Sequence, residues 1–285
     1  MSCLPFRYRS LSRPPRVFWE RAVWRIAVLA AGIVVVAWGG RVARADVLFW
    51  TERFESYPAN SSVDGKDSTW SATGYEQSWV RTVPYPVHSG SRSLQTLNAG
   101  LAGTWQGPHW WDDTPSKPHG ALVDLSWWMY VDTTTYTDPH WQISVDGWNG
   151  NTVAMLGNNE RGSKSSVDYQ TTSGWFESFQ DVVMNQWSHV FLQVAFARNP
   201  DQYRFRVGDA ATWSDWFTLG TNEEYFRKIN FAGGSYYSGS VDWRAEVFYD
   251  DMSGSVVPEP GVPSLLCTLG LSSFALFGMR RRKSR

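Results

Sequence analysis

The stretch that decides the fold is residues 121–132, ALVDLSWWMYVD, in which hydrophobic and polar residues alternate strictly. A period of two places successive side chains on opposite faces of an extended strand. The two expected faces are Val123, Leu125, Trp127, Met129 and Val131 on one side, and Asp124, Ser126, Trp128, Tyr130 and Asp132 on the other. We therefore expect a half-buried β-strand whose apolar face lies in the core.

The same alternation occurs elsewhere in the chain. Trp141, Ile143 and Val145 alternate with polar residues before a turn at 147–151. Further strands are expected at 47–54, 93–97, 228–232 and 241–252. Stretches rich in proline, serine and aspartate at 57–68, and glycine- and proline-flanked residues at 107–120, are expected to be surface loops.

A hairpin is predicted where residues 187–197 return through 198–201 into 202–208. Its core side would be Val190, Leu192, Val194 and Phe196, facing Tyr203, Phe205 and Val207. Between the terminal segments no stretch has a convincing helical period. The predicted fold class is therefore all-β, a two-sheet antiparallel β-sandwich of the jelly-roll kind, formed by residues 46–256.

The C-terminal end has three parts: Val257-Pro258-Glu259-Pro260, an uncharged stretch at 261–279, and a basic end at 280–285. A helix over the uncharged stretch would be roughly 28 Å long, which is enough to span a bilayer. The basic residues would remain in the cytoplasm, so the preceding domain would lie outside. This order resembles the PEP-CTERM sorting signal, which implies processing by an exosortase-type membrane protease. The alternative is a C-terminal anchor that is never cleaved.

The N-terminal end has the layout of a signal peptide. Residues 1–25 contain six arginines and one acid, and the uncharged run 26–40 follows them. Ala43 and Ala45 supply small residues for a cleavage site before Asp46. We expect residues 1–45 to direct export, with an uncleaved anchor as the alternative.

The charge of the chain changes once the terminal segments are set aside. Residues 46–259 contain 13 basic and 26 acidic residues, a net charge of −13, whereas the whole chain has −1. This acidity argues against nucleic acid as a partner. Cys3 and Cys267 both lie in the terminal segments, so no disulfide is expected in the exported domain.

Several short motifs follow one another along the predicted domain: Phe54-Glu55, HSGSRSL at 88–94, Trp187-Ser188-His189-Val190, and VFYDDM at 247–252. Together they resemble the concanavalin A-like or laminin G-like jelly-roll group. The galactose-binding-like sandwich shares the first and last of them, so the choice between jelly rolls stays open. Resemblance to these groups implies a structural calcium and a saccharide-binding face.

Calcium takes about six to eight oxygen ligands. Glu55 near the first strand, and Asp250 or Asp251 near the last, match positions where such sandwiches tie their ends with a metal. Alternation from residue 241 places Asp251 on the inward side, where an unpaired carboxylate would be costly, so Asp251 is the better candidate of the two. The alternative is a carboxylate that pairs with an arginine or with backbone amides.

Polar faces of the predicted strands are candidates for binding sugars, because aromatic rings stack on sugar rings while amides and guanidinium groups bind hydroxyls. These candidates are Trp128, Tyr130, Gln142, His189, Gln193, Arg204 and Arg206, and we expect Trp110 and Trp111 to lie in a loop at the rim. They would share one surface if their strands are neighbours. The alternative is that the aromatic residues pack under loops.

Catalytic motifs are absent from the sequence of the predicted domain. The acidic pairs at 112–113, 223–224 and 250–251 would point to opposite faces of a strand, and the histidines have no metal-binding spacing. We therefore expect an exported, non-enzymatic cell-surface or matrix protein that binds extracellular polysaccharide. A polysaccharide-active enzyme or a purely structural surface protein are the alternatives.

Overall fold

The structure, a computed structural model, describes residues 47–64, 69–72, 77–97, 107–112, 122–134, 139–158, 165–196, 198–209, 211–233 and 245–257. These residues belong to one unit that extends over 45–260. The predicted signal peptide, with Ala43, Ala45 and Asp46, lies outside the described residues, as do Pro258, Glu259, Pro260 and the stretch after them. Within the described ranges, no helix is long and apolar enough to cross a membrane.

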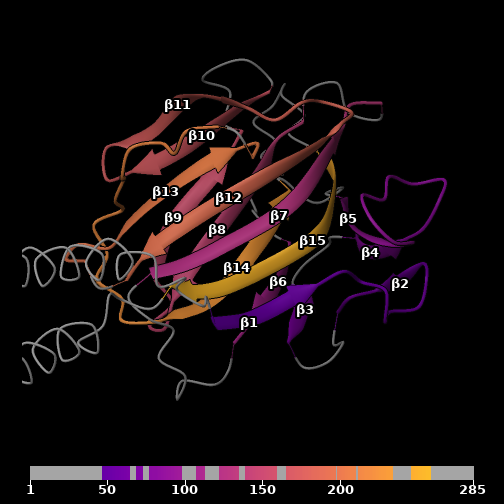
Figure 1. Ribbon diagram of the computed structural model, residues 1–285, viewed down its shortest axis with the longest axis horizontal. Helices are drawn as coiled ribbons and strands as arrows, with labels where there is room; N and C mark the ends of the chain where they lie inside the picture. Colours follow the sequence, from indigo (N-terminus) through magenta and orange to yellow (C-terminus); the bar gives the residue numbers. More distant parts are fainter. Residues whose placement is uncertain are drawn as a thin grey trace, which may run out of the picture. The chain divides into compact units, whose positions relative to one another are not determined.

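Two antiparallel sheets, A and B, form a β-sandwich (Figure 1). Sheet A has the order β13 (Gln202–Val207), β12 (Trp187–Ala195), β7 (Leu122–Asp132), β15 (Glu246–Val257), β5 (Ser93–Leu97), β4 (Gln77–Arg81) and β2 (Ser61–Ser62), and β1 (Val47–Glu52) also pairs with β15. Sheet B has the order β11 (Gly174–Asp181), β10 (Ser166–Thr171), β9 (Thr152–Gly157), β8 (Trp141–Gly147), β14 (Phe226–Gly233), β6 (Pro108–Trp111) and β3 (Trp70–Ala72).

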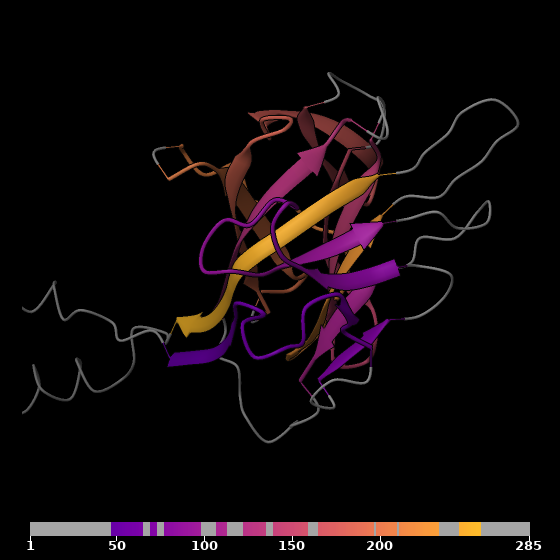
Figure 2. The same ribbon diagram turned by 90° about the vertical axis from the view of Figure 1, so that its right-hand side faces the viewer.

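The last strands of the chain are inserted between much earlier ones. In sheet B, β14 lies between β8 and β6, and in sheet A, β15 lies between β7 and β5. The turned view shows β15 running diagonally across the sandwich, with its C-terminal end beside β1 (Figure 2). Because the chain changes sheet between β7 and β8 and again between β14 and β15, the arrangement is that of a jelly roll.

Large aromatic side chains join the two sheets. Trp127 of sheet A packs edge-on against Phe231 of sheet B, with ring centroids 5.9 Å apart, and Phe231 also contacts Tyr249 of sheet A at 4.8 Å. All three rings are fully buried. The expected inward faces of β7 and of the β12–β13 hairpin are confirmed: their members are at most 3% exposed, except for the half-buried Val207.

Alternation did not predict every strand. Seven strands had no prediction: β2, β3, β4, β6, β9, β10 and β11. Most are short, and β2 and β6 lie inside stretches expected to be loops. In sheet B, the polar residues of β8 are nearly as buried as its apolar ones.

One prediction about the last strand is wrong. A β-bulge between Asp250 and Ser253 adds a residue to β15, and Asp251 has a positive φ of 46°. Met252 therefore takes the inward position expected for Asp251 and is 1% exposed. Because a bulge leaves its extra residue unpaired, the strand changes register there, and alternation read along the sequence cannot be carried past it.

Candidate functional site

Six of the predicted sugar-binding residues share the outward face of sheet A: Trp128 and Tyr130 of β7, His189 and Gln193 of β12, and Arg204 and Arg206 of β13. The strand pairing places Trp128 opposite His189, and Gln193 opposite Arg204. The expectation of a single surface is only partly correct, because Gln142 and Trp111 lie on the outward face of sheet B. Trp110 is not part of a rim: it is 7% exposed and stacks on Trp50 in the core, with centroids 4.8 Å apart.

Trp128 lies between two imidazole rings. His88 stacks on it with centroids 3.9 Å apart and His189 with centroids 4.5 Å apart, and both rings are within 17° of parallel. His189 comes from β12, and His88 lies on the opposite flank, beside Asp250 of β15. Both faces of the indole are thus covered, so Trp128 cannot lie flat on a sugar ring in this arrangement.

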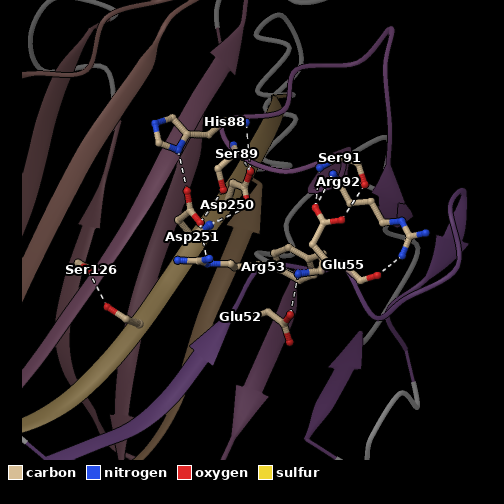
Figure 3. Close-up of polar contacts among 12 residues, drawn as sticks. Glu52, Arg53, Glu55, His88, Ser89, Ser91, Arg92, Ser126, Asp250 and Asp251 are labelled. Atoms are coloured by element: carbon tan, nitrogen blue, oxygen red, sulfur yellow. Dashed lines mark hydrogen bonds and ion pairs between the residues drawn. The ribbon is translucent and has the colours of Figure 1, made fainter.

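The segment 88–92 that carries His88 is held by three carboxylates (Figure 3). One oxygen of Asp250 accepts the N–H groups of His88 and Ser89 at 3.1 and 3.0 Å. Asp251 contacts the His88 Nδ1 at 2.7 Å and accepts the Ser89 hydroxyl at 2.8 Å. Glu55 accepts the Ser91 N–H and hydroxyl, each at 2.6 Å. Segment 88–92 is therefore fastened to the turn that follows the first strand and to the last strand of the sandwich.

These three carboxylates are the residues predicted as calcium ligands. In the structure they accept hydrogen bonds from nearby donors, and Asp251 also pairs with Arg53 at 3.2 Å. Among the described residues, no group of three or more histidine, cysteine or acidic side chains is arranged to hold a metal ion. Calcium binding therefore stays a prediction. The pairing with arginine and backbone amides, considered as the alternative, accounts for where the carboxylates point.

Two of the three carboxyl groups have shifted pKa values in opposite directions. Burial raises the pKa of Asp250 to about 6, and the neighbouring charge of Asp251 adds to that shift. The Ser91 hydroxyl and N–H lower the pKa of Glu55. Asp250 is fully buried, whereas Glu55 is exposed, so desolvation dominates for the first and hydrogen bonding for the second.

A second histidine–aspartate pair lies on the other side of Trp128. The His189 Nδ1 is 2.7 Å from Asp209, as the His88 Nδ1 is from Asp251. Burial lowers the pKa of His189, although the hydrogen bond from its ring to Asp209 opposes that effect. A neutral imidazole whose Nδ1–H donates to a carboxylate has an Nε2 lone pair available as a proton acceptor.

The outward face of sheet B holds a different set of polar groups. Three neighbouring rows of the sheet contain Ser71, His109, Asn230 and Ser144; Trp111, Lys228, Asp146 and Thr152; and Gln142, Gly157 and Asp168. Five of these polar residues, Gln142, Ser144, Asp146, His109 and Asp168, are no more than 9% exposed although their side chains leave the sandwich. We name the first two of these rows, from Ser71 to Ser144 and from Trp111 to Thr152, the polar face of sheet B.

Asp146 is the centre of this polar face. It pairs with Lys228 at 3.0 Å, accepts the Thr152 hydroxyl at 2.8 Å and lies 3.3 Å from the Asn230 amide nitrogen. The same amide donates to Ser144 at 2.8 Å. Because the carboxylate and the ammonium group neutralise each other, the centre has little net charge and several fixed hydrogen-bonding groups.

Other groups beside this centre keep unused hydrogen-bonding capacity. The Nε2 of His109 is buried and has no hydrogen-bond partner among the described residues. Burial lowers the pKa of His109, and the charge of Lys228 lowers it further. The Gln142 amide forms no hydrogen bond to another described residue. The indole of Trp111 stands at the edge, with the Lys228 ammonium 5.1 Å from its centroid.

Sequence reasoning did not select Lys228, Asn230 or Asp146 as site residues. A usable signal existed at 228–232, where Lys228 and Asn230 alternate with the buried Ile229 and Phe231. It was insufficient because alternation says that a side chain leaves the core but does not say which polar residue of another strand lies beside it.

No family model and no curated protein matches the chain. Among solved structures, a carbohydrate esterase from Shiga toxin-encoding bacteriophage phi24B has a TM-score of 0.49 at 9% identity and covers 74% of this chain and 99% of its own. An endo-β-1,4-glucuronan lyase from Trichoderma reesei has a TM-score of 0.48 at 11% identity, covering 74% and 100%. The CBM22-1 xylan-binding domain from Paenibacillus barcinonensis Xyn10C has a TM-score of 0.35 at 15% identity, and the match covers 76% of this chain and 99% of that domain. These likenesses are too remote to carry a function to this chain.

Proposed function

We propose that the protein binds polysaccharide through the polar face of sheet B. The observation that carries the proposal is the buried His109 Nε2, which has no partner among the described residues on a face of otherwise ordered polar groups. A buried polar atom without a partner is costly unless a ligand or water satisfies it. A sugar hydroxyl, which both donates and accepts, suits an imidazole nitrogen in either tautomer.

The composition of this face suits a neutral sugar. Asn230 and Ser144 supply amide and hydroxyl groups, and Gln142 adds an amide from the adjacent row. The Lys228 ammonium retains donors beyond its contact with Asp146. Trp111 supplies an aromatic surface at the edge of the set. The near cancellation of charge between Lys228 and Asp146 favours hydroxyl-rich ligands over strongly charged ones.

The test is affinity electrophoresis of the full chain in gels containing a neutral polysaccharide such as xylan or a β-glucan. Asn230→Ala and Lys228→Gln should each weaken retardation about tenfold, the effect of losing one well-placed hydrogen bond. Arg204→Gln on sheet A is the matched control and should leave retardation unchanged. Equal retardation of all variants, with unchanged thermal unfolding, would rule out the polar face of sheet B as the site.

We further propose that the chain is exported and delivered to the cell envelope as a PEP-CTERM-type substrate of an exosortase-like protease. The order of motif, uncharged stretch and basic end supports this proposal, as does the N-terminal signal layout. Replacing Pro258-Glu259-Pro260 with three alanines should abolish the loss in mass that accompanies processing. Identical fragment sizes for the two chains on an immunoblot would contradict it.

A polysaccharide-active enzyme is the second candidate, and His189 favours it. Its Nδ1 is oriented by Asp209, and its lowered pKa keeps the imidazole neutral, as a general base requires. Release of reducing ends or unsaturated products from polysaccharide, abolished by His189→Gln, would establish this activity. If none of the polymers that the protein binds is degraded, binding alone is the function.

A further inference from the structure

We infer that the outward face of sheet A is a second binding site, for a carboxylate-bearing polysaccharide, formed by alternating arginine and tryptophan side chains. The side chains stack in the order Arg206, Trp213, Arg204, Trp216 and Arg198, and we name them the arginine ladder. Successive guanidinium-to-indole distances along it are 5.2, 4.8, 4.5 and 4.3 Å. The ladder does not depend on the polar face of sheet B, which lies on the other sheet.

The backbone holds the ladder in place from two sides. Arg204 and Arg206 lie two residues apart on β13, so both side chains leave the same face of the sheet. Residues 211–217 run beside this strand: the Ser214 N–H donates to the Phe205 carbonyl at 2.8 Å, and Tyr203 and Phe217 exchange two hydrogen bonds of 2.9 and 2.7 Å. The two tryptophans are thereby brought between the arginines.

Each guanidinium group uses few of its N–H donors within the protein. The Arg204 Nε donates to Gln193 at 2.7 Å, Arg206 donates to the Asp209 carbonyl at 2.5 Å, and Arg198 donates to Gln202. Among the described residues, no carboxylate lies within salt-bridge distance of any of the three. Since arginine has five N–H donors, each retains several for a ligand.

Three unpaired cations in so acidic a domain need a physical reason. Residues 46–259 have a net charge of −13, and the charge of Asp124 acts on Arg204 without an ion pair within salt-bridge distance. Stacking on indole rings stabilises the guanidinium groups without neutralising them. At physiological ionic strength, distant acidic residues are screened over about 8 Å, so the local positive charge decides which ligand can approach.

The geometry favours carboxylates on a polymer. A guanidinium group binds a carboxylate through two parallel hydrogen bonds, and stacking fixes its plane so that little entropy is lost on binding. Three such groups in a row match several acidic sugars of one chain better than a single small anion.

The test is affinity electrophoresis of the full chain in polygalacturonate, with the methyl-esterified polymer as the matched ligand and a chelator present to exclude bridging by calcium. We expect retardation in the acidic polymer that falls as salt is raised, and none in the ester. Arg204→Gln and the exposed Arg198→Gln should each weaken binding about tenfold. Arg81→Gln is the matched control, because Arg81 of β4 lies over Trp79 and Tyr85, toward the opposite end of the strand order of sheet A from β13.

The outcomes separate the two proposed sites. Lys228→Gln should retain polygalacturonate binding, and Arg204→Gln should retain binding of the neutral polymer. The two proposed sites can therefore be confirmed or contradicted independently. Equal retardation in the ester, or an Arg81→Gln effect as large as that of Arg198→Gln, would overturn the arginine ladder as a carboxylate site. Tighter binding of single-stranded DNA than of polygalacturonate would overturn it as well. Unchanged thermal unfolding of Arg198→Gln keeps the test independent of folding.

Discussion

The imidazole of His88 lies flat on the indole of Trp128, with ring centroids 3.9 Å apart and planes 17° apart. His88 reaches this position from the segment between β4 and β5, whereas Trp128 belongs to β7. The contact therefore depends on the carboxylates of Asp250, Asp251 and Glu55, which hold segment 88–92 against the sandwich. A surface expected to bind sugar by exposed aromatic rings is, at this point, closed by the protein's own side chains.

Trp128→Ala should reduce stability without weakening the binding of neutral polysaccharide. The substitution removes two stacked contacts from a half-buried ring, a loss of about 1–3 kcal/mol in the free energy of unfolding. Urea unfolding and affinity electrophoresis measure the two effects separately. A selective loss of neutral-polysaccharide binding, with stability unchanged, would show that Trp128 belongs to the binding site.

Gly90→Ala should disrupt the attachment of segment 88–92. Gly90 has a positive φ of 64°, and an added Cβ would lie 2.4 Å from the Glu55 Oε1. Gly150→Ala is the matched control, because Gly150 also has a positive φ, of 88°, but has no atom within 4 Å of an added Cβ. Strain alone should cost about 1 kcal/mol at either position, and thermal unfolding should reveal a further loss only at Gly90. Equal losses would mean that Glu55 moves aside freely.

Asp201→Asn should stabilise the protein at neutral pH. Asp201 is fully buried, its carboxylate accepts the Glu223 N–H at 2.6 Å, and burial raises its pKa to about 6 from 3.8. A raised carboxyl pKa means that the folded state binds the proton more tightly than the unfolded state, so stability falls as pH rises from about 4 to 6. The asparagine amide can still accept the N–H without this ionisation.

The stability difference between Asp201→Asn and the parent chain should therefore depend on pH. The variant should be more stable by up to about 3 kcal/mol above pH 6, and the difference should shrink towards zero below pH 4. Urea unfolding at several pH values measures it. A difference that does not change between pH 4 and 7 would show that Asp201 has an ordinary pKa in the folded state.

Asp209→Asn should lower the pKa of His189 further. Burial lowers this pKa, while the hydrogen bond and charge of Asp209 raise it, so removing the carboxylate leaves burial less opposed. NMR titration of the His189 ring protons should show a midpoint below 6.5 in the parent chain and a lower one in the variant. An unchanged midpoint would mean that the 2.7 Å contact does not persist in solution.

Alternation predicted the central strands well because side-chain direction is a local property of an extended backbone. The inward residues of β7, such as Leu125 and Trp127, are buried as expected. It failed at Asp251, where the bulge in β15 adds a residue. Composition, not alternation, misplaced Trp110, because a short strand flanked by glycine and proline resembles a loop in sequence.

Residue pattern alone determined that this chain folds as an all-β sandwich, and it identified the apolar sides of β7, β12 and β13, since both follow from the period of two. Tertiary structure decided which polar side chains meet. Asp146 lies beside Asn230, 84 positions away, because β14 inserts next to β8. Such neighbours depend on the order of strands in the sheets. That order is selected by burial of the apolar surface of all strands together, so the sequence of a single strand does not encode it.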